Sequence, residues 1–528
     1  MKTKILFISC LTFFLILTSF IIFKNKKNQN NDSHTGIDFG KFEINNIRSW
    51  FHNNGIFNLD STRINSGFEW PKDSMKNAKY VSGIWLGAKV GNDTLITHAW
   101  YGSQYLPGFI DDNGNPQGKS DPDYRIYSIV RGDTLSPDYL NWPADQGAYT
   151  NSIGKPFPLG TQTMFYSFTD GYSDNHNSTP GNTAPLKAQI LQTNWAYSNV
   201  NLRDVIFTEF RIINRSNMIW NNSYFGVFTD DDIGDAYDDA SGIDTNRNLT
   251  YTYNFDNNDP SYGNAPPSVG LLLLRSPVKY TANSNDSVRY FQPPGSTNLI
   301  VKPNYKYTGL HAFNISENAF EGPRNYREAV YFFEGRKIDN SNWIDPTTNL
   351  PTVKPFAGDP VTGSGWLMNQ GDEMRTFTSF GNITVLPNDT QSIIVAQLIA
   401  RGSYNLNSIT KLKELSDYVQ TVYNNNFQDV LAINNVSNSL PSEFELHQNY
   451  PNPFNPRTVI NYELRVTSNA KLKVFDVLGN EVATLVNEKQ SAGDYKVEFD
   501  GSNFASGVYF YKLDAGDFSE TKRMILLK

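Results

Sequence analysis

The twelve residues DVIFTEFRIINR, from Asp204 to Arg215, decide the fold class of most of this 528-residue chain. Apolar side chains dominate the even-numbered positions from Ile206 to Ile212, whereas the odd-numbered positions include Glu209 and Arg211. A period of two is that of a β-strand, because successive side chains of a strand point to opposite faces of the sheet. The stretch therefore predicts a strand with one face buried in a core.

Segments of the same kind recur up to about residue 433, and Gly, Asn, Asp and Pro separate them. Two clear examples are KYVSGIWLGAKV, from Lys79 to Val90, and NSYFGVFTD, from Asn222 to Asp230. Aromatic residues make up 14% of the chain, and aromatic side chains favour strands. Residues 31–433 are therefore predicted to form one large β-rich unit, which is called the passenger below.

One stretch near the end of the passenger has the periodicity of a helix. In SITKLKELSDYVQTVY, from Ser408 to Tyr423, the apolar residues recur every three or four positions. Asn407 or Ser408 has a side chain suited to cap such a helix. The stripe comprises Ile409, Leu412, Leu415, Val419 and Val422. We expect one late α-helix that packs on the core of an otherwise all-β passenger.

The last part of the chain again shows strand periodicity, in TVINYEL, KLKVFDVLGNEVATL, DYKVEFDG and GVYFYKLDAGDFSETKRMILLK. Strands at this spacing predict an immunoglobulin-like antiparallel β-sandwich over residues 444–528. The polar, aperiodic residues 434–443 are predicted to be a linker. The prolines of NYPNPFNP, from Asn449 to Pro456, have no N–H group, so this segment is expected to be a stiff boundary and not a central strand.

The C-terminal region, from about Phe444 to Lys528, resembles the type A C-terminal sorting domain of the type IX secretion system. The resemblance rests on the YPNP opening, on Asp476-x-Leu478-Gly479, on Ala492-Gly493 and Asp500-Gly501, on the ASGVY segment and on the lysine-rich end. The candidate sorting-motif residues are Tyr450, Pro451, Asn452, Pro453, Gly479, Gly493, Gly507, Tyr509, Lys522 and Lys528.

This resemblance implies export. Proteins of this kind cross the inner membrane with a signal peptide, and an outer-membrane translocon then recognises the folded C-terminal domain. A sortase-like protease commonly removes that domain, and the passenger is attached to surface lipopolysaccharide or released. The passenger segments around Asp230 and FAGDPVTGSGW, from Phe356 to Trp366, are similar to segments of large uncharacterised secreted proteins, which implies no particular activity.

The N-terminal region is consistent with export. Lys2 and Lys4 precede the apolar run from Ile5 to Phe23, which predicts a signal peptide within residues 1–30. The run is also long enough to span a bilayer, so an uncleaved anchor is the alternative. Cys10 is the sole cysteine of the chain, so removal of the signal would leave no thiol for disulfides or metal.

The formal net charge of the chain is -8. This acidic balance argues against nucleic acid as a partner, because phosphate binding needs clustered Lys and Arg.

The most pointed cluster of polar residues in the passenger is TDDDIGDAYDDASGID, which begins at Thr229. Carboxylates this close repel one another, and a hard cation such as Ca²⁺, which takes six to eight oxygen ligands, relieves the repulsion. The sequence predicts a structural calcium site, and the alternatives are a solvated acidic loop or a catalytic role. The candidate ligands are Asp230, Asp232, Asp235 and Asp239.

Enzyme motifs are missing from the sequence. We find no H-E-x-x-H, no G-x-S-x-G and no phosphate-binding glycine loop. A glycosidase needs only two carboxylates across a cleft, which a sequence does not reveal. Tryptophans that could stack on sugars, or else fill the core, are Trp50, Trp70, Trp85, Trp100 and Trp366. We therefore predict a non-enzymatic surface or binding protein, with a secreted carbohydrate-active enzyme or other hydrolase as the alternative.

Overall fold

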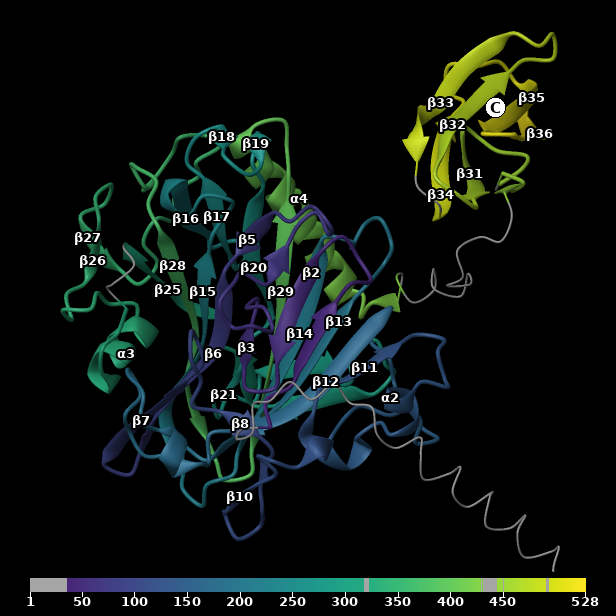
Figure 1. The fold of residues 1–528 in the computed structure, drawn as a ribbon. Helices are drawn as coiled ribbons and strands as arrows, with labels where there is room; N and C mark the ends of the chain where they lie inside the picture. Colours follow the sequence, from purple (N-terminus) through teal and green to yellow (C-terminus); the bar gives the residue numbers. More distant parts are fainter. Residues whose placement is uncertain (1–35, 318–321, 429, 431–443, 450, 491–492) are drawn as a thin grey trace, which may run out of the picture. The chain divides into compact units, whose positions relative to one another are not determined.

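The computed structural model describes residues 36–528 apart from 318–321, 429, 431–443, 450 and 491–492 (Figure 1). The chain forms two compact units, Met1–Phe427 and Gln428–Lys528. The predicted signal segment, 1–30, and the predicted linker, 434–443, lie outside the described residues.

The first large sheet of the passenger has ten described strands, all paired antiparallel. In spatial order they run β25-β28-β15-β6-β3-β2-β4-β5, with β1 on β2 and β7 on β6. Their bounds are β1 (Phe39–Phe42), β2 (Arg48–His52), β3 (Ile56–Phe57), β4 (Phe68–Glu69), β5 (Asn77–Lys79), β6 (Val81–Val90), β7 (Asp93–His98), β15 (Trp220–Asp231), β25 (Leu310–Glu317) and β28 (Met374–Val385).

The second large sheet has nine described strands. Its order is β11-β12-β13-β14-β29-β20-β17-β16, with β8 on β12. Their bounds are β8 (Leu106–Pro107), β11 (Tyr127–Val130), β12 (Gln162–Thr169), β13 (Ala188–Ala196), β14 (Val205–Asn214), β16 (Asp239–Asp244), β17 (Leu249–Asn254), β20 (Ser268–Arg275) and β29 (Thr390–Ala400).

The two sheets pack on each other around one hydrophobic core that takes side chains from both (Figure 1). Phe210 of β14 and Phe225 of β15 both lie in this core, and each is only 1% exposed. Burial of such a side chain contributes about 1.5–3 kcal/mol. Polar contacts also cross the interior: the Asn58 Nδ2 atom donates to Gln397 Oε1 at 2.7 Å.

Short hairpins and helices lie outside the two large sheets. The hairpins pair β9 (Phe109–Ile110) with β10 (Pro116–Gln117), β18 (Asn258–Asp259) with β19 (Gly263–Asn264), β21 (Val278–Tyr280) with β24 (Tyr305–Tyr307), β22 (Ser287–Phe291) with β23 (Leu299–Pro303), and β26 (Trp343–Asp345) with β27 (Leu350–Thr352). The helices are α2 (Pro137–Leu140), α3 (Tyr326–Phe333) and α4 (Asn405–Asn424), with 3₁₀ turns η2 (Pro122–Tyr124), η3 (Ala144–Gln146), η4 (Ser173–Asn175) and η5 (Ala236–Asp238).

The second unit is a two-layer antiparallel sandwich. One layer orders its strands β30-β31-β34 and the other β33-β32-β35-β36. Their bounds are β30 (Glu445–Leu446), β31 (Arg457–Leu464), β32 (Ser468–Phe475), β33 (Glu481–Gln490), β34 (Gly493–Asp500), β35 (Gly507–Ala515) and β36 (Phe518–Leu526). Leu472, Tyr511 and Leu526 are fully buried between the layers, so this unit has a core of its own.

The predicted all-β fold with a late helix is confirmed, and α4 covers residues 405–424 where the sequence predicted 408–423. The short helices α2 and α3 were not predicted. The sequence predicted that one face of β14 is buried. This was wrong for the other face, because all ten residues of β14 are buried. Its second face is covered: Glu209 accepts hydrogen bonds from Tyr149 Oη at 2.8 Å and from Ser392 Oγ at 2.7 Å.

Candidate functional site

The acidic segment connects the two large sheets of the passenger, running from the end of β15 through η5 into β16. Neighbouring carboxylates at the end of β15 point to opposite faces of the strand. The Tyr101 hydroxyl donates to Asp230 Oδ2 at 2.6 Å, and Arg375 Nε lies 3.6 Å from Asp230 Oδ1. Asp231 instead lies 2.5 Å from Lys79 Nζ and accepts from Thr252 Oγ1 at 2.7 Å. Asp230 and Asp231 therefore have different partners on opposite faces of β15.

Burial raises the pKa of several of these carboxyl groups. It raises the pKa of Asp230 to about 6 despite the Tyr101 hydrogen bond. It raises the pKa of Asp232 to about 8, and the charges of Asp230 and Glu373 add to the effect. Burial likewise holds the pKa of Asp239 well above its usual range. Neutral acids or a bound cation would each relieve this crowding.

Several oxygen atoms around the acidic segment are buried without a hydrogen-bond partner among the described residues. They are Asp230 Oδ1, Asp232 Oδ1, Asp239 Oδ1 and Asn254 Oδ1. Asp239 and Asn254 are fully buried, and Asp230 is 3% exposed. An unsatisfied buried acceptor costs about 1–3 kcal/mol, so Asp232 Oδ1 and Asp239 Oδ1 each call for a proton, a water or a cation, and Asn254 Oδ1 for a water or a cation. Asp230 Oδ1 differs from them, because it faces the Arg375 guanidinium.

Asp235, the remaining predicted ligand, has a different role. Its side chain accepts from the backbone N–H of Tyr237 at 3.1 Å and thereby caps η5. In the part of the chain that the structure describes, no three carboxylates of the segment bring one oxygen each within 4.8 Å of one another. The four predicted ligands therefore do not form one compact set, and the calcium site stays a prediction.

Sequence reasoning missed Asp259, which organises the turn of the acidic segment. Asp259 Oδ2 accepts from the backbone N–H of Asp235 at 2.8 Å, and Oδ1 accepts from that of Ser261 at 2.8 Å. Gly234 has a φ of +75°, and a Cβ atom there would lie 2.2 Å from Asp259 Oδ1. The positive φ and the close approach both require glycine. A remote carboxylate carries no local signal that could have identified this role.

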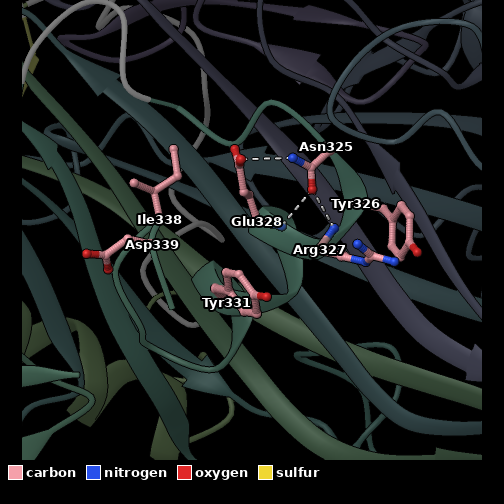
Figure 2. A pocket seen from close by; sticks show the side chains of 7 residues that line it. All are labelled: Asn325, Tyr326, Arg327, Glu328, Tyr331, Ile338 and Asp339. Atoms are coloured by element: carbon pink, nitrogen blue, oxygen red, sulfur yellow. Dashed lines mark hydrogen bonds between the residues drawn. The ribbon is translucent and has the colours of Figure 1, made fainter. Parts of the chain in front are cut away.

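An open hollow lies beside α3 and has a volume of about 420 Å³. Figure 2 shows its lining, in which the Asn325 side chain accepts from the backbone N–H groups of Arg327 and Glu328 at 3.0 and 3.2 Å. Asn325 is thus the N-cap that fixes the first turn of the helix. The lining residues are Asn325, Tyr326, Arg327, Glu328, Tyr331, Ile338 and Asp339.

A second open hollow, of about 520 Å³, lies beside the β9–β10 hairpin. Tyr172 lines it, and the Lys119 ammonium lies 5.2 Å from the centre of the Tyr172 ring.

Of the candidate tryptophans, Trp70 and Trp85 are buried, at 7% and 1% exposure. Trp100 packs edge-on against Trp85, with ring centres 5.4 Å apart. Trp70 and Trp85 therefore belong to the core, and Trp100 packs against it while partly buried.

The proline-rich segment belongs to the sandwich that follows it. Phe454, 1% exposed, lies in the sandwich core, and its backbone N–H donates to Ile525 O at 2.9 Å. Asn452 Oδ1 accepts from the backbone N–H of Ile525 at 2.9 Å, and Thr458 Oγ1 donates to Pro451 O at 2.8 Å. The described residues of the segment form no regular strand, as its prolines predicted, and they are in addition held onto β36 by these hydrogen bonds. Tyr450 lies outside the described residues.

The other candidate motif residues lie at a turn, at strand starts, within strands and at the C-terminal end of this sandwich. Gly479, with φ +83°, forms the turn between β32 and β33, and Gly493 and Gly507 begin β34 and β35. The Tyr509 hydroxyl donates to Ala505 O at 3.0 Å. Lys522 Nζ lies 2.9 Å from Glu520 Oε1, and Lys528 Nζ donates to Ser502 O at 2.7 Å. These residues are distributed over the sandwich and do not form one cluster.

Comparison with known families identifies the second unit. Residues 448–527 match the family model described as a secretion system C-terminal sorting domain. This match makes the chain a substrate of the type IX secretion system, destined for the cell surface or the extracellular space. Interaction with the type IX secretion machinery follows from it. No curated protein matches the sequence.

Solved structures show weak similarity. A polysaccharide lyase matches with 9% identity and a TM-score of 0.25, over 94% of this chain and 47% of the lyase, so the chain spans about half the length of that protein. Dimeric latent PorU of Porphyromonas gingivalis matches with 9% identity and a TM-score of 0.14, over 93% and 32%. PorZ of the same organism matches with 10% identity and a TM-score of 0.13, over 95% and 83%.

No described helix is both long and apolar enough to cross a membrane.

Proposed function

We propose that this exported chain is a non-enzymatic surface protein whose passenger binds an extended polar ligand, a glycan or a peptide. The observation that carries the proposal is the open hollow beside α3. Two half-buried tyrosines, Tyr326 and Tyr331, line it together with the charged side chains of Arg327, Glu328 and Asp339. Tyr and Arg are the residues that dominate binding surfaces, because they combine a large contact area with hydrogen-bonding groups.

The shape of the hollow suits binding better than catalysis. Catalytic sites exclude water, which strengthens electrostatic interactions with the transition state. The α3 hollow is open to solvent, with exposed Arg327 and Asp339 at its rim. A solvated site of this kind can hold a glycan of the cell's own lipopolysaccharide or of another surface, through aromatic contact and charged hydrogen bonds.

A binding screen of the purified passenger against glycans and peptides tests this function. We expect a ligand whose affinity falls roughly tenfold in Tyr331→Ala, a loss of about 1.4 kcal/mol. The matched control is Tyr418→Ala, because Tyr418 is a tyrosine on the surface of another helix, α4, at 37% exposure. Equal losses in both variants, or a ligand that binds Tyr331→Ala as tightly as the wild type, would contradict the α3 site.

The alternative, a carbohydrate-active enzyme or other hydrolase, is favoured by one observation. Asp232, with its pKa raised to about 8, lies near Asp230, whose pKa is about 6. Acids separated in pKa in this way can divide the roles of general acid and base. Product release from any glycan found in the screen, abolished in Asp232→Asn, would establish this alternative and overturn the non-enzymatic function.

A structural calcium ion at the acidic segment is part of the proposed function. The buried, unpartnered oxygens of Asp232 and Asp239 are its main support, with Asp230 Oδ1 as a further oxygen. Asp235 is left out, since it caps η5. Backbone carbonyls and water would complete the six to eight ligands that Ca²⁺ takes.

Chelation is expected to lower the melting temperature of the passenger by a few degrees, and more at about pH 8 than at about pH 6. The raised pKa of Asp232, about 8, means that the folded, metal-free protein keeps a proton that the unfolded chain loses near pH 4. The contribution of Asp232 to stability without calcium therefore falls as pH rises from about 4 to 8. Calcium replaces that proton, so its stabilising effect grows over the same range. Differential scanning calorimetry with and without calcium measures it.

The matched control for the calcium prediction is Asp232→Asn, which removes one ligand and one buried charge. In this variant the response to calcium should be weaker, and the fall in stability between about pH 4 and 8 should be smaller. A melting temperature that does not change with calcium at any pH would refute the site.

A further inference from the structure

A second cluster of ligand atoms lies in the sorting sandwich, outside every motif identified above. Among the described residues, Glu445, His447 and Glu463 bring a ring nitrogen and two carboxylate oxygens within 4.8 Å of one another. His447 Nε2 lies 3.0 Å from Glu463 Oε1, and His447 Nδ1 lies 3.3 Å from Glu445 Oε1. Each ring nitrogen of one imidazole thus faces a carboxylate.

Strand register brings these three side chains together. β30 pairs antiparallel with β31, so that Glu445 is opposite Glu463, and the His447 backbone N–H donates to Asn461 O at 2.9 Å. Leu446 and Tyr462, the neighbours in between, are fully buried in the sandwich core. Because side chains alternate along a strand, Glu445, His447 and Glu463 share the outer face of the sheet.

The backbone beneath this cluster is held firmly, while its side chains remain accessible. The fully buried Tyr511 hydroxyl donates to His447 O at 2.8 Å and accepts from the backbone N–H of Asn449 at 2.8 Å. The side chains are 59% (Glu445), 36% (His447) and 24% (Glu463) exposed. An ion can therefore reach the cluster from solvent.

We propose that Glu445, His447 and Glu463 bind a divalent transition-metal ion, Zn²⁺, that fastens β30 to β31. Imidazole nitrogen selects Zn²⁺ over Ca²⁺ or Mg²⁺, which prefer oxygen alone. Zn²⁺ is commonly held by three protein ligands and one water. β30 has only two residues, so a metal bridge to β31 adds substantially to the few hydrogen bonds that hold the first strand of the sandwich.

Zinc binding to the metal-free full chain tests the site, because it can be counted by equilibrium dialysis and compared between variants. We expect His447→Gln to bind one Zn²⁺ fewer per chain than the wild type, and Glu463→Gln to bind that ion roughly tenfold or more weakly. Co²⁺ in place of Zn²⁺ should give the visible absorption of a nitrogen- and oxygen-ligated ion in the wild type and lose it in His447→Gln.

The matched control is Glu498→Gln, which removes a carboxylate from β34 of the same sheet, 56% exposed and paired with Arg457. Its zinc stoichiometry and affinity should equal those of the wild type. Zinc should also raise the melting temperature of the sandwich in the wild type and in Glu498→Gln but not in His447→Gln. Equal zinc binding by the wild type and His447→Gln, or binding of Mg²⁺ as tight as that of Zn²⁺, would overturn the proposal.

Discussion

Deletion of residues 444–528 is expected to abolish delivery of the protein to the cell surface and to leave the passenger in the periplasm. The reason is that residues 448–527 match the secretion sorting domain, and they lie in a compact unit with its own hydrophobic core. The passenger has a separate core, so the truncated chain should remain folded. Immunoblots of surface, medium and periplasmic fractions measure the effect, and circular dichroism of the purified passenger checks its fold.

A pair of point variants separates loss of the domain's structure from loss of chain length. Phe454→Ala removes a core side chain of the proline-rich segment, which we expect to destabilise the sandwich by about 3–5 kcal/mol and to reduce export strongly. Leu478→Ala alters an apolar residue that is 82% exposed at a turn of the same sandwich, and export should be unchanged. Surface delivery of the truncated chain at the wild-type level would be incompatible with a sorting role for residues 444–528.

The largest effect on the stability of the passenger is expected from Lys79→Met. Lys79 and Asp231 form an ion pair with side chains only 2% and 5% exposed, and Asp231 connects the sheets through Thr252. Removal of one member of a buried pair leaves an uncompensated charge, which costs about 3–5 kcal/mol. Urea denaturation followed by tryptophan fluorescence measures the free energy of unfolding.

Two controls accompany this variant. The double variant Lys79→Met, Asp231→Leu removes both charges and should recover most of the lost stability, because a buried pair can be replaced by apolar groups of similar volume. Lys411→Met breaks the exposed pair with Glu414 on α4, which we expect to change stability by less than about 1 kcal/mol. A small effect of Lys79→Met, similar to that of Lys411→Met, would show that the buried pair contributes little.

Local sequence patterns predicted much of the secondary structure. The alternation in Asp204–Arg215 predicted β14, and the apolar stripe of Ser408–Tyr423 predicted α4. The predicted caps of α4 were wrong for a tertiary reason. The helix begins three residues earlier, and the Ser408 hydroxyl donates to Pro266 O at 2.7 Å and accepts from Gly402 N–H at 2.9 Å.

The candidate sites were less accessible to sequence reasoning. The acidic segment was noticed because its carboxylates are adjacent in sequence, yet adjacent residues of a strand face opposite sides, so Asp230 and Asp231 have different partners. Glu445, His447 and Glu463 were not noticed as a set, because the third residue is distant in sequence and joins the others only through the β30–β31 register.

The sequence by itself determined the all-β class, the late helix and the C-terminal sorting domain, since backbone periodicity and a dense motif are both local properties. Only the tertiary structure decided which charges are buried and which ligand atoms meet. The charged face of β14 illustrates the difference: Glu209 is fully buried because Tyr149, Arg275 and Ser392 come from other parts of the chain to pair with it. Long-range strand register positions such partners, and no local pattern encodes that register.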